Sequence, residues 1–220
     1  MDILKIEGPP GFDTPAFALS QVAAATGVPV NTIRTWYGRG HFTIGMTDKE
    51  NPGEGLARLV SGRTAIGIGI TGALARMGVT PGRAAYAAYT FAHTGDQDKN
   101  APEFWRLPGR LWGGSVMTVL ALPAIADDLP EVRRVGPTDT FAAHFAWALP
   151  GGDHFNQGAV YLYLNELVDA VRVALGFPRD AEDWLLNAER MAAQAMLPDA
   201  GEVPKPKKST KTAARRLEEE

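Results

Sequence analysis

The stretch from Phe17 to Phe42 constrains the fold more than any other, because its pattern predicts two short helices joined by a tight turn. The run Gln21–Thr26 is rich in alanine and favours a helix, and we expect the Ser20 hydroxyl to cap its start. Gly27 fits the position just after a helix end, where a positive φ costs little. A second helix is then predicted from Pro29, whose fixed φ suits a helix start.

The second predicted helix has an apolar face and a polar one. Val30, Ile33 and Tyr37 are spaced three and four residues apart and should share the apolar face. The polar residues that point elsewhere are Asn31, Thr32, Arg34, Thr35 and Arg39. A helix pair of this kind is typical of a helix-turn-helix, whose second helix enters the major groove. Asparagine and arginine pair with adenine and guanine edges, and threonine hydroxyls can hold phosphates. The alternative is a helical hairpin that only packs and exposes a solvated polar face.

The run LSQVAAATGVPVNTIRTWYGRG resembles the N-terminal DNA-binding domain of the MerR family. In that family, S-x-V-A-x-x-T-G-V leads into T-I-R-x-W/Y. The matching residues are Ser20, Val22, Ala23, Thr26, Gly27, Val28, Thr32, Ile33, Arg34 and Tyr37. A looser similarity continues through ARLVSGRTAIGIGITGALARMGVTPGRAA, so the resemblance spans about residues 17–93. It implies a winged helix-turn-helix that binds double-stranded DNA, with Arg34 and the turn that contains Arg39 contacting it.

The segment after the helix pair predicts a wing. Two apolar stretches, Phe42–Ile44 and Leu56–Val60, flank a loop rich in glycine, proline and charge, which is the pattern of a β-hairpin with a long tip. Lys49 at the tip and Arg58 on the returning strand are placed to reach phosphates. The chain departs from the MerR family in lacking a sustained heptad repeat after His93 and in lacking the metal-sensing cysteines of several members. Metal sensing and the family's DNA-untwisting mechanism are therefore not implied.

Residues 63–77 predict a helix that contains three glycines, and Pro81 predicts the start of a second helix that runs to about Ala92. Its apolar residues repeat at intervals of four, four and three: Ile66, Ile70, Leu74 and Met77. Gly67, Gly69 and Gly72 oppose a helix, each by about 1 kcal/mol relative to alanine, but they permit close packing. They also spell G-x-G-x-x-G. A dinucleotide site needs a preceding strand and an acidic residue about 20 positions later, and the sequence favours a packing helix instead.

The polar run from 93 to 101 predicts a domain boundary. Beyond it, apolar runs predict strands at 116–122, 141–149 and 159–164, an edge strand or turn at VRRVGPTDT, a helix at 166–175 capped by Asn165, and a helix at 180–196. The predicted fold class is therefore α+β. A flexible arm (1–15) precedes the helical winged helix-turn-helix domain (16–93). A small α+β module for oligomerisation or sensing (102–197), with a short mixed or antiparallel sheet and two helices, leads to a disordered tail (198–220).

Charge separates the predicted domains. The net charge of −3 divides into about +2 over residues 1–93, −7 over 94–200 and +2 over 201–220. A basic N-terminal domain followed by an acidic domain is typical of a DNA-binding module joined to a module with another role. Residues 1–93 are only mildly basic, which gives one copy few phosphate contacts. We therefore expect a homodimer, which doubles the number of these contacts.

No other pattern predicts a site. The chain has no cysteine, which excludes disulfides and thiolate ligands. His41, His93, His144 and His154 show no metal-ligand spacing. The aromatic residues of the second module are more typical of a core or an interface than of a ligand pocket, although a small-molecule effector stays possible. We therefore expect no catalytic residue, cofactor or metal. With no run of about 18 apolar residues and no secretory signal, we expect a cytoplasmic protein that does not enter membranes.

The sequence predicts a DNA-binding transcriptional regulator that is not an enzyme. The first alternative is a phage-type DNA-binding factor, such as an excisionase-like, packaging or recombination component. The second is a protein-interaction module that does not bind DNA. An enzyme built on the second module ranks last, because no nucleophile–base pair or metal cluster is visible.

Overall fold

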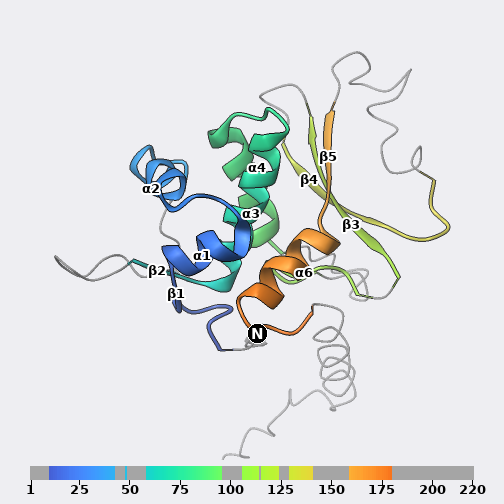
Figure 1. The fold of residues 1–220 in the computed structure, drawn as a ribbon. Helices are drawn as coiled ribbons and strands as arrows, with labels where there is room; N and C mark the ends of the chain where they lie inside the picture. The colour runs from blue at the N-terminus through green and yellow to red at the C-terminus, as the bar shows by residue number, and fades with distance from the viewer. Residues whose placement is uncertain are drawn as a thin grey trace, which may run out of the picture. The chain divides into compact units, whose positions relative to one another are not determined.

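The computed structural model describes residues 10–42, 48, 58–95, 106–113, 115–123, 129–140 and 159–179. These residues form a mixed α+β structure with five helices and two small antiparallel sheets (Figure 1). None of the described helices is both long and apolar enough to cross a membrane. Four predictions lie outside the described residues: the position of Lys49, the strand at 141–149, the helix at 180–196 and the tail at 198–220.

The two helices and the tight turn are confirmed as α1 (Leu19–Thr26) and α2 (Val30–Gly38). Gly27 has a φ of 67° and its N–H donates to the carbonyl of Ala23 at 2.9 Å, so it ends α1 as expected. The prediction that Ser20 caps α1 is wrong. The capping position is Ala18, whose N–H donates to Oε1 of Gln21 at 2.9 Å. The cap lies earlier because residue 18 is already held extended in a strand.

That strand is β1 (Phe17–Ala18), which pairs antiparallel with β2 (Leu59–Val60). The end of the second predicted wing strand therefore pairs with residues that precede α1. The first predicted wing strand, Phe42–Ile44, and the loop tip lie almost entirely outside the described residues. The hairpin itself consequently remains a prediction.

Helices α3 (Gly62–Arg76) and α4 (Pro81–Ala92) confirm the two helices predicted after the wing. Ser61 caps α3, because its Oγ accepts from the N–H of Thr64 at 3.2 Å. Every residue from Thr64 to Leu74 is buried, so α3 is surrounded by the rest of the protein. The three glycines of G-x-G-x-x-G lie inside this helix, and a Cβ at position 69 would stand 3.2 Å from Cγ2 of Val171. The packing interpretation of these glycines is confirmed.

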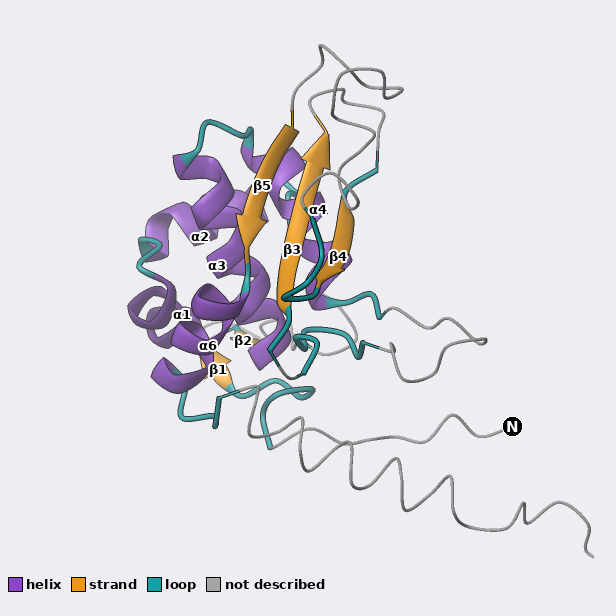
Figure 2. Cartoon of the chain, turned by 90° about the vertical axis from the view of Figure 1, so that its right-hand side faces the viewer, coloured by secondary structure: helices purple, strands orange, loops and turns teal. Residues whose placement is uncertain are grey.

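The second sheet has the order β4-β3-β5 and is antiparallel throughout. Its strands are β3 (Met117–Pro123), β4 (Glu131–Val135) and β5 (Ala159–Tyr163), and they confirm the strands predicted at 116–122 and 159–164 and the edge strand of VRRVGPTDT. Helix α6 (Asn165–Ala174) follows β5 directly. Figure 2 shows the helices gathered on one side of this sheet.

Asn165 does not cap α6 as predicted, since the capping position is Leu164. Instead, Oδ1 of Asn165 accepts from the N–H of Thr118 at 2.7 Å, and its Nδ2 donates to the carbonyl of Val116 at 3.1 Å. The amide is used to join the start of α6 to β3. A side chain with both a donor and an acceptor can satisfy two strand groups at once, and this use explains the departure from the cap.

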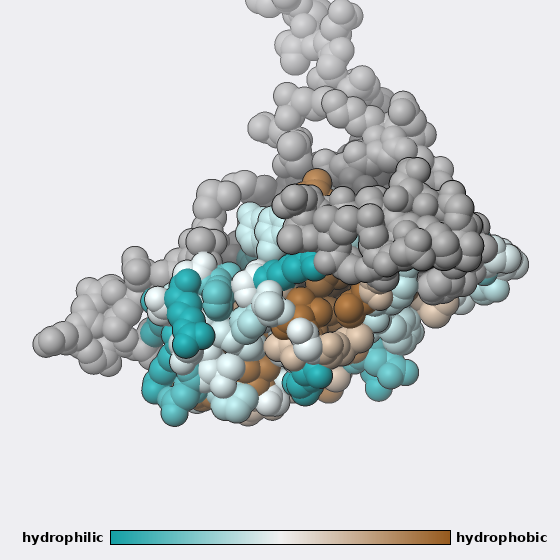
Figure 3. Space-filling model, turned by 90° about the horizontal axis from the view of Figure 1, so that it is seen from above, coloured by the Kyte–Doolittle hydropathy of each residue, from teal (hydrophilic) through white to brown (hydrophobic). Residues whose placement is uncertain are grey.

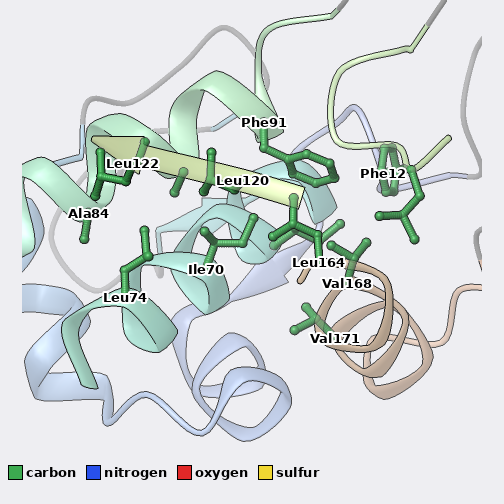
Figure 4. Close-up of a cluster of buried hydrophobic side chains, with 14 of the residues drawn as sticks. Phe12, Ile70, Leu74, Ala84, Phe91, Leu120, Leu122, Leu164, Val168 and Val171 are labelled. Atoms are coloured by element: carbon green, nitrogen blue, oxygen red, sulfur yellow. The ribbon is translucent and has the colours of Figure 1, made fainter. Parts of the chain in front are cut away.

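One hydrophobic core runs across the boundary predicted at 93–101. Ile70 and Phe91 come from the first predicted domain, and they pack in one cluster with Leu120 and Val168 from the second (Figure 4). Both segments belong to one compact unit, Met1–Leu186. Within the described residues, the predicted boundary therefore does not separate two cores.

The described end of the predicted flexible arm is held in this core. Phe12 is fully buried, with the guanidinium carbons of Arg110 and Arg172 at 4.1 and 5.0 Å from its ring centroid. Asp13 forms an ion pair with Arg63. Residues 10–15 are consequently an anchored segment, because an aromatic side chain and a paired carboxylate fix them to the helices.

Candidate nucleic-acid interface

Helix α2 is attached by one apolar side. Ile33 and Trp36 are buried, whereas Tyr37, which we expected on the same seam, is only half-buried. The ring centroids of Trp36 and Tyr37 lie 6.0 and 5.6 Å from that of Phe42. The spacing rule selected Tyr37, but Trp36 is the residue that joins Ile33 in the buried cluster, and Tyr37 packs at the edge of that cluster.

The opposite side of α2 carries the predicted DNA-binding residues. Asn31, Arg34 and Thr35 are exposed, and their spacing of three and four puts them together on one face. Thr32 is half-buried, and Arg39 is exposed just after the helix. The hydroxyl of Thr35 donates to the carbonyl of Asn31 at 2.8 Å, so its proton is used inside the helix and the oxygen can only accept. A phosphate oxygen is also an acceptor, which makes Thr35 a poorer phosphate ligand than the sequence implied.

The surroundings of α2 are basic. Residues 14–42 and 58–95 contain no Asp, Glu or Lys, and their charged side chains are six arginines: Arg34, Arg39, Arg58, Arg63, Arg76 and Arg83. Hydrophilic residues dominate the left of Figure 3, the side on which Figure 1 places α2. Two arginines are used internally, since Arg63 pairs with Asp13 and Arg83 donates to the carbonyl of Pro123. The other four place positive charges of the kind that attract phosphates near α2, with the carboxylate of Asp48 close to Tyr37.

Arg58 is fixed against α2. Its guanidinium carbon lies 4.4 Å from the centroid of the Tyr37 ring, a cation–π geometry. Burial raises the pKa of Tyr37, the carboxylate of Asp48 adds to this rise, and Arg58 opposes it. The phenol therefore stays protonated at neutral pH. Arg58, which we expected to contact phosphate, is thus held against α2 by the ring of Tyr37. Lys49, the other expected contact of the wing, lies outside the described residues.

Arg76 is a candidate that the sequence reasoning missed. It is exposed at the end of α3. A Cβ on Gly72 would stand 3.5 Å from Nη1 of Arg76 and would overlap Cγ2 of Val28, so the guanidinium lies beside the turn that precedes α2. The signal in the sequence was its position in the last helical turn after an uncharged run. Only the tertiary packing of α3 shows that its last turn adjoins the turn between α1 and α2.

Asp48 ties the predicted wing loop to α3. Its carboxylate accepts from the N–H of Ser61 at 2.9 Å and from the hydroxyl of Thr64 at 2.8 Å. A carboxylate is stabilised at a helix N-terminus by the unpaired N–H groups and by the helix dipole. Nε2 of His93 lies 3.4 Å from the same hydroxyl, and the imidazole stacks on Tyr89. Asp48, Thr64 and His93 therefore connect the loop, α3 and the end of α4.

The arrangement of these three residues differs from that of a hydrolytic triad. In a triad, the imidazole stands between the hydroxyl and the carboxylate, whereas here the Thr64 hydroxyl stands between Asp48 and His93. Burial lowers the pKa of His93, with Asp48 opposing this shift and Arg63 adding to it. In the part of the chain that the structure describes, no cluster of three His, Cys, Asp or Glu residues could hold a metal.

The aromatic residues of the second module fall into two groups. Trp112 is buried beside Arg106, whose Nη1 donates to the carbonyl of Phe91 at 3.1 Å and whose Nη2 donates to that of Thr94 at 2.8 Å. This tryptophan therefore belongs to the packing between the two predicted domains. Tyr163 is exposed on β5. Tyr161, on the same strand, is half-buried, and the other four aromatic residues of this module, Phe104, Trp105, Trp147 and Phe155, lie outside the described residues.

No protein-family model matches this chain, and no curated protein is significantly similar to it in sequence. The resemblance to the MerR family consequently rests on the residues quoted for it.

Proposed function

We propose that this chain binds double-stranded DNA in a sequence-specific manner through α2. The observation that carries the proposal is the exposed row of Asn31, Arg34 and Thr35 on a helix whose other side is anchored by Ile33 and Trp36. A helix whose one side is packed in the core presents the side chains of its other side rigidly, and recognition of base edges requires this rigidity. The charged side chains of residues 14–42 and 58–95 are all arginines, which favours a polyanionic ligand.

The side chains on α2 and near it divide into two roles. Asn31 and Arg34 read bases, because an amide and a guanidinium each form two hydrogen bonds with one base edge. The groups that hold the DNA backbone are Thr32, Arg39, Lys49 and Arg58, while Thr35, whose hydroxyl donates to the carbonyl of Asn31, contributes less. The protein acts as a homodimeric transcriptional regulator in the cytoplasm and catalyses no reaction. Two copies on a symmetric site double the phosphate contacts and set the half-site spacing.

Selection of bound sequences from a random DNA library tests the proposal, followed by titration of the selected and scrambled duplexes. Arg34→Ala should reduce the preference for the selected duplex by about tenfold or more, since one bidentate base contact contributes about 1–3 kcal/mol. Arg39→Ala should weaken both duplexes about equally. Arg179→Ala removes the same charge from an exposed site after α6 and is the matched control. Failure to select any sequence at low salt, or equal behaviour of all three variants, contradicts the proposal.

Mapping of bound sites across the genome separates the regulator from the phage-type alternative. Enrichment at promoters supports regulation of transcription, whereas enrichment at a single attachment or packaging site supports a phage-type factor.

A further inference from the structure

Asp48 occupies one acceptor position at the start of α3. Its Oδ1 accepts from the N–H of Ser61 at 2.9 Å. The hydroxyl oxygen of Thr64 lies 2.8 Å from Oδ1 and 2.9 Å from Oδ2, so its single proton is shared between the two carboxylate oxygens. Ser61 and Thr64 are both buried. The carboxylate is therefore held by two buried donors at one end of one helix.

The other N–H groups at this helix start have different acceptors. Those of Gly62 and Arg63 donate to the carbonyls of residues 11 and 12 at 2.9 and 3.2 Å. That of Thr64 donates to Oγ of Ser61 at 3.2 Å. The carboxylate therefore has a single place at the start of α3, where the N–H of Ser61 and the helix dipole offset part of its charge.

The same carboxylate lies near the aromatic ring that holds Arg58. Burial raises the pKa of Tyr37, the Asp48 carboxylate adds to this rise and Arg58 opposes it, so both charges act on one phenol. The guanidinium carbon of Arg58 lies 4.4 Å from the centroid of that ring. Arg58 also precedes Ser61, which is bonded to Asp48, by three positions. Asp48 consequently constrains Arg58 in two ways, by opposite charge and through the backbone that leads into α3.

An acidic residue close to a DNA-binding surface repels phosphates unless it has another role. Among the described residues from 14 to 95, Asp48 is the only acidic one. We propose that Asp48 is a positioning residue of the interface, which fixes Arg58 for a phosphate contact and does not itself touch DNA. The inference rests on the proposed function and names the residue through which one of its phosphate contacts is held in place.

The affinity of Asp48→Ala for DNA separates positioning from mere proximity. A carboxylate that only lies near DNA repels it, so its removal would strengthen the binding of every duplex. A positioning carboxylate has the opposite effect. We expect Asp48→Ala to weaken the selected and scrambled duplexes by about fivefold each, and to lower the slope of log K against log salt concentration by about 1, as the loss of one phosphate contact does. Stronger or unchanged binding overturns the inference.

A double-mutant cycle tests whether Asp48 acts through Arg58. Arg58→Ala should weaken binding about as much as Asp48→Ala. The double variant should bind no more weakly than Arg58→Ala alone, because a residue that acts through another has no further effect once the other is removed. Additive losses overturn the inference. Circular dichroism and urea denaturation establish that each variant is folded.

Limited proteolysis reports on Arg58 without DNA. Trypsin must take the Arg58 side chain into its own specificity pocket, so packing on Tyr37 should slow cleavage after this residue. Thr64→Val removes the hydroxyl that holds Asp48. It should speed cleavage after Arg58 by about tenfold relative to cleavage after the exposed Arg39, since a hydrogen bond to a charged group contributes about a factor of ten or more. An unchanged ratio overturns the inference.

Thr71→Val is the matched control for the proteolysis. Thr71 is also buried in α3, but its hydroxyl donates to the carbonyl of Gly67. The cleavage ratio should not change in this variant, and an equal rise in both variants would assign the effect to lost stability and overturn the inference. An unmodified protein that selects no DNA sequence refutes the proposed function, whatever the cleavage shows. A protein that binds DNA specifically and keeps its affinity after Asp48→Ala refutes the inference alone.

Discussion

Gly72 of α3 lies against Val28, in the turn that precedes α2, so closely that a Cβ on the glycine would overlap Cγ2 of the valine. Both residues are buried, and Val28 belongs to the cluster that holds Ile33 and Trp36. The turn between α1 and α2 therefore packs on the glycine side of α3. Because Val28 is β-branched, it has few alternative rotamers with which to move away.

Gly72→Ala should destabilise the fold by about 1–3 kcal/mol, the usual cost of inserting a methyl group into a packed core. Gly67→Ala is the matched control in the same helix. Its Cβ would meet Cβ of Ala92 at 3.4 Å, an ordinary contact, and alanine is the better helix former by about 1 kcal/mol. Urea denaturation of both variants checks the prediction. A Gly72 variant as stable as the Gly67 variant would show that the close approach is absent.

The sequence predicted the helices and strands well, but it did not predict how these elements pack together. Local signals such as Gly27, Pro81 and the apolar repeat of α3 depend on the backbone of a few residues, and the helices they predicted are present. The common core depends on contacts between distant residues, such as that between Gly69 and Val171. A polar run at 93–101 indicates a loop, but it does not reveal whether the segments on either side pack together.

In the candidate site, too, the features that depend on local spacing were predicted and the contacts between distant residues were not. The exposed face of Asn31 and Arg34 follows from helical spacing alone, and the structure bears out their exposure. Asp48 and Thr64 are 16 residues apart, and no local pattern indicates that the carboxylate would meet that hydroxyl. Arg76 likewise comes near the turn between α1 and α2 only through the packing of α3.

Phe12→Ala should destabilise the protein by about 3–5 kcal/mol, the usual range for a fully buried phenylalanine. The substitution leaves a cavity and removes the ring against which Arg110 and Arg172 stack. Phe12→Leu keeps most of the apolar volume but removes the aromatic face, so its smaller loss isolates the contribution of the stacking. Thermal and urea denaturation measure both changes. Wild-type stability of Phe12→Ala would contradict the burial of the N-terminal segment.

Stability should fall as the pH drops below about 6.5, the ordinary pKa of histidine, because burial lowers the pKa of His93 in the folded state. The unfolded chain then binds more protons than the folded one, so the contribution of neutral His93 is complete above the unfolded pKa and is lost as the pH falls towards the folded pKa. His93→Gln cannot titrate and should flatten this part of the profile. Urea denaturation at pH 7.5 and 5.5 compares the two proteins, and equal losses would assign the pH dependence to other groups.

Arg76→Ala should weaken DNA binding without changing sequence preference. Its guanidinium lies beside the turn that precedes α2, where it can meet a phosphate next to the bases that α2 reads. Loss of one phosphate contact lowers the slope of log K against log salt concentration by about 1 and reduces affinity for every duplex alike. Titration of the selected and scrambled duplexes at three salt concentrations measures both effects. A changed preference between the duplexes would mean that Arg76 reads a base, and an unchanged salt slope would place it outside the interface.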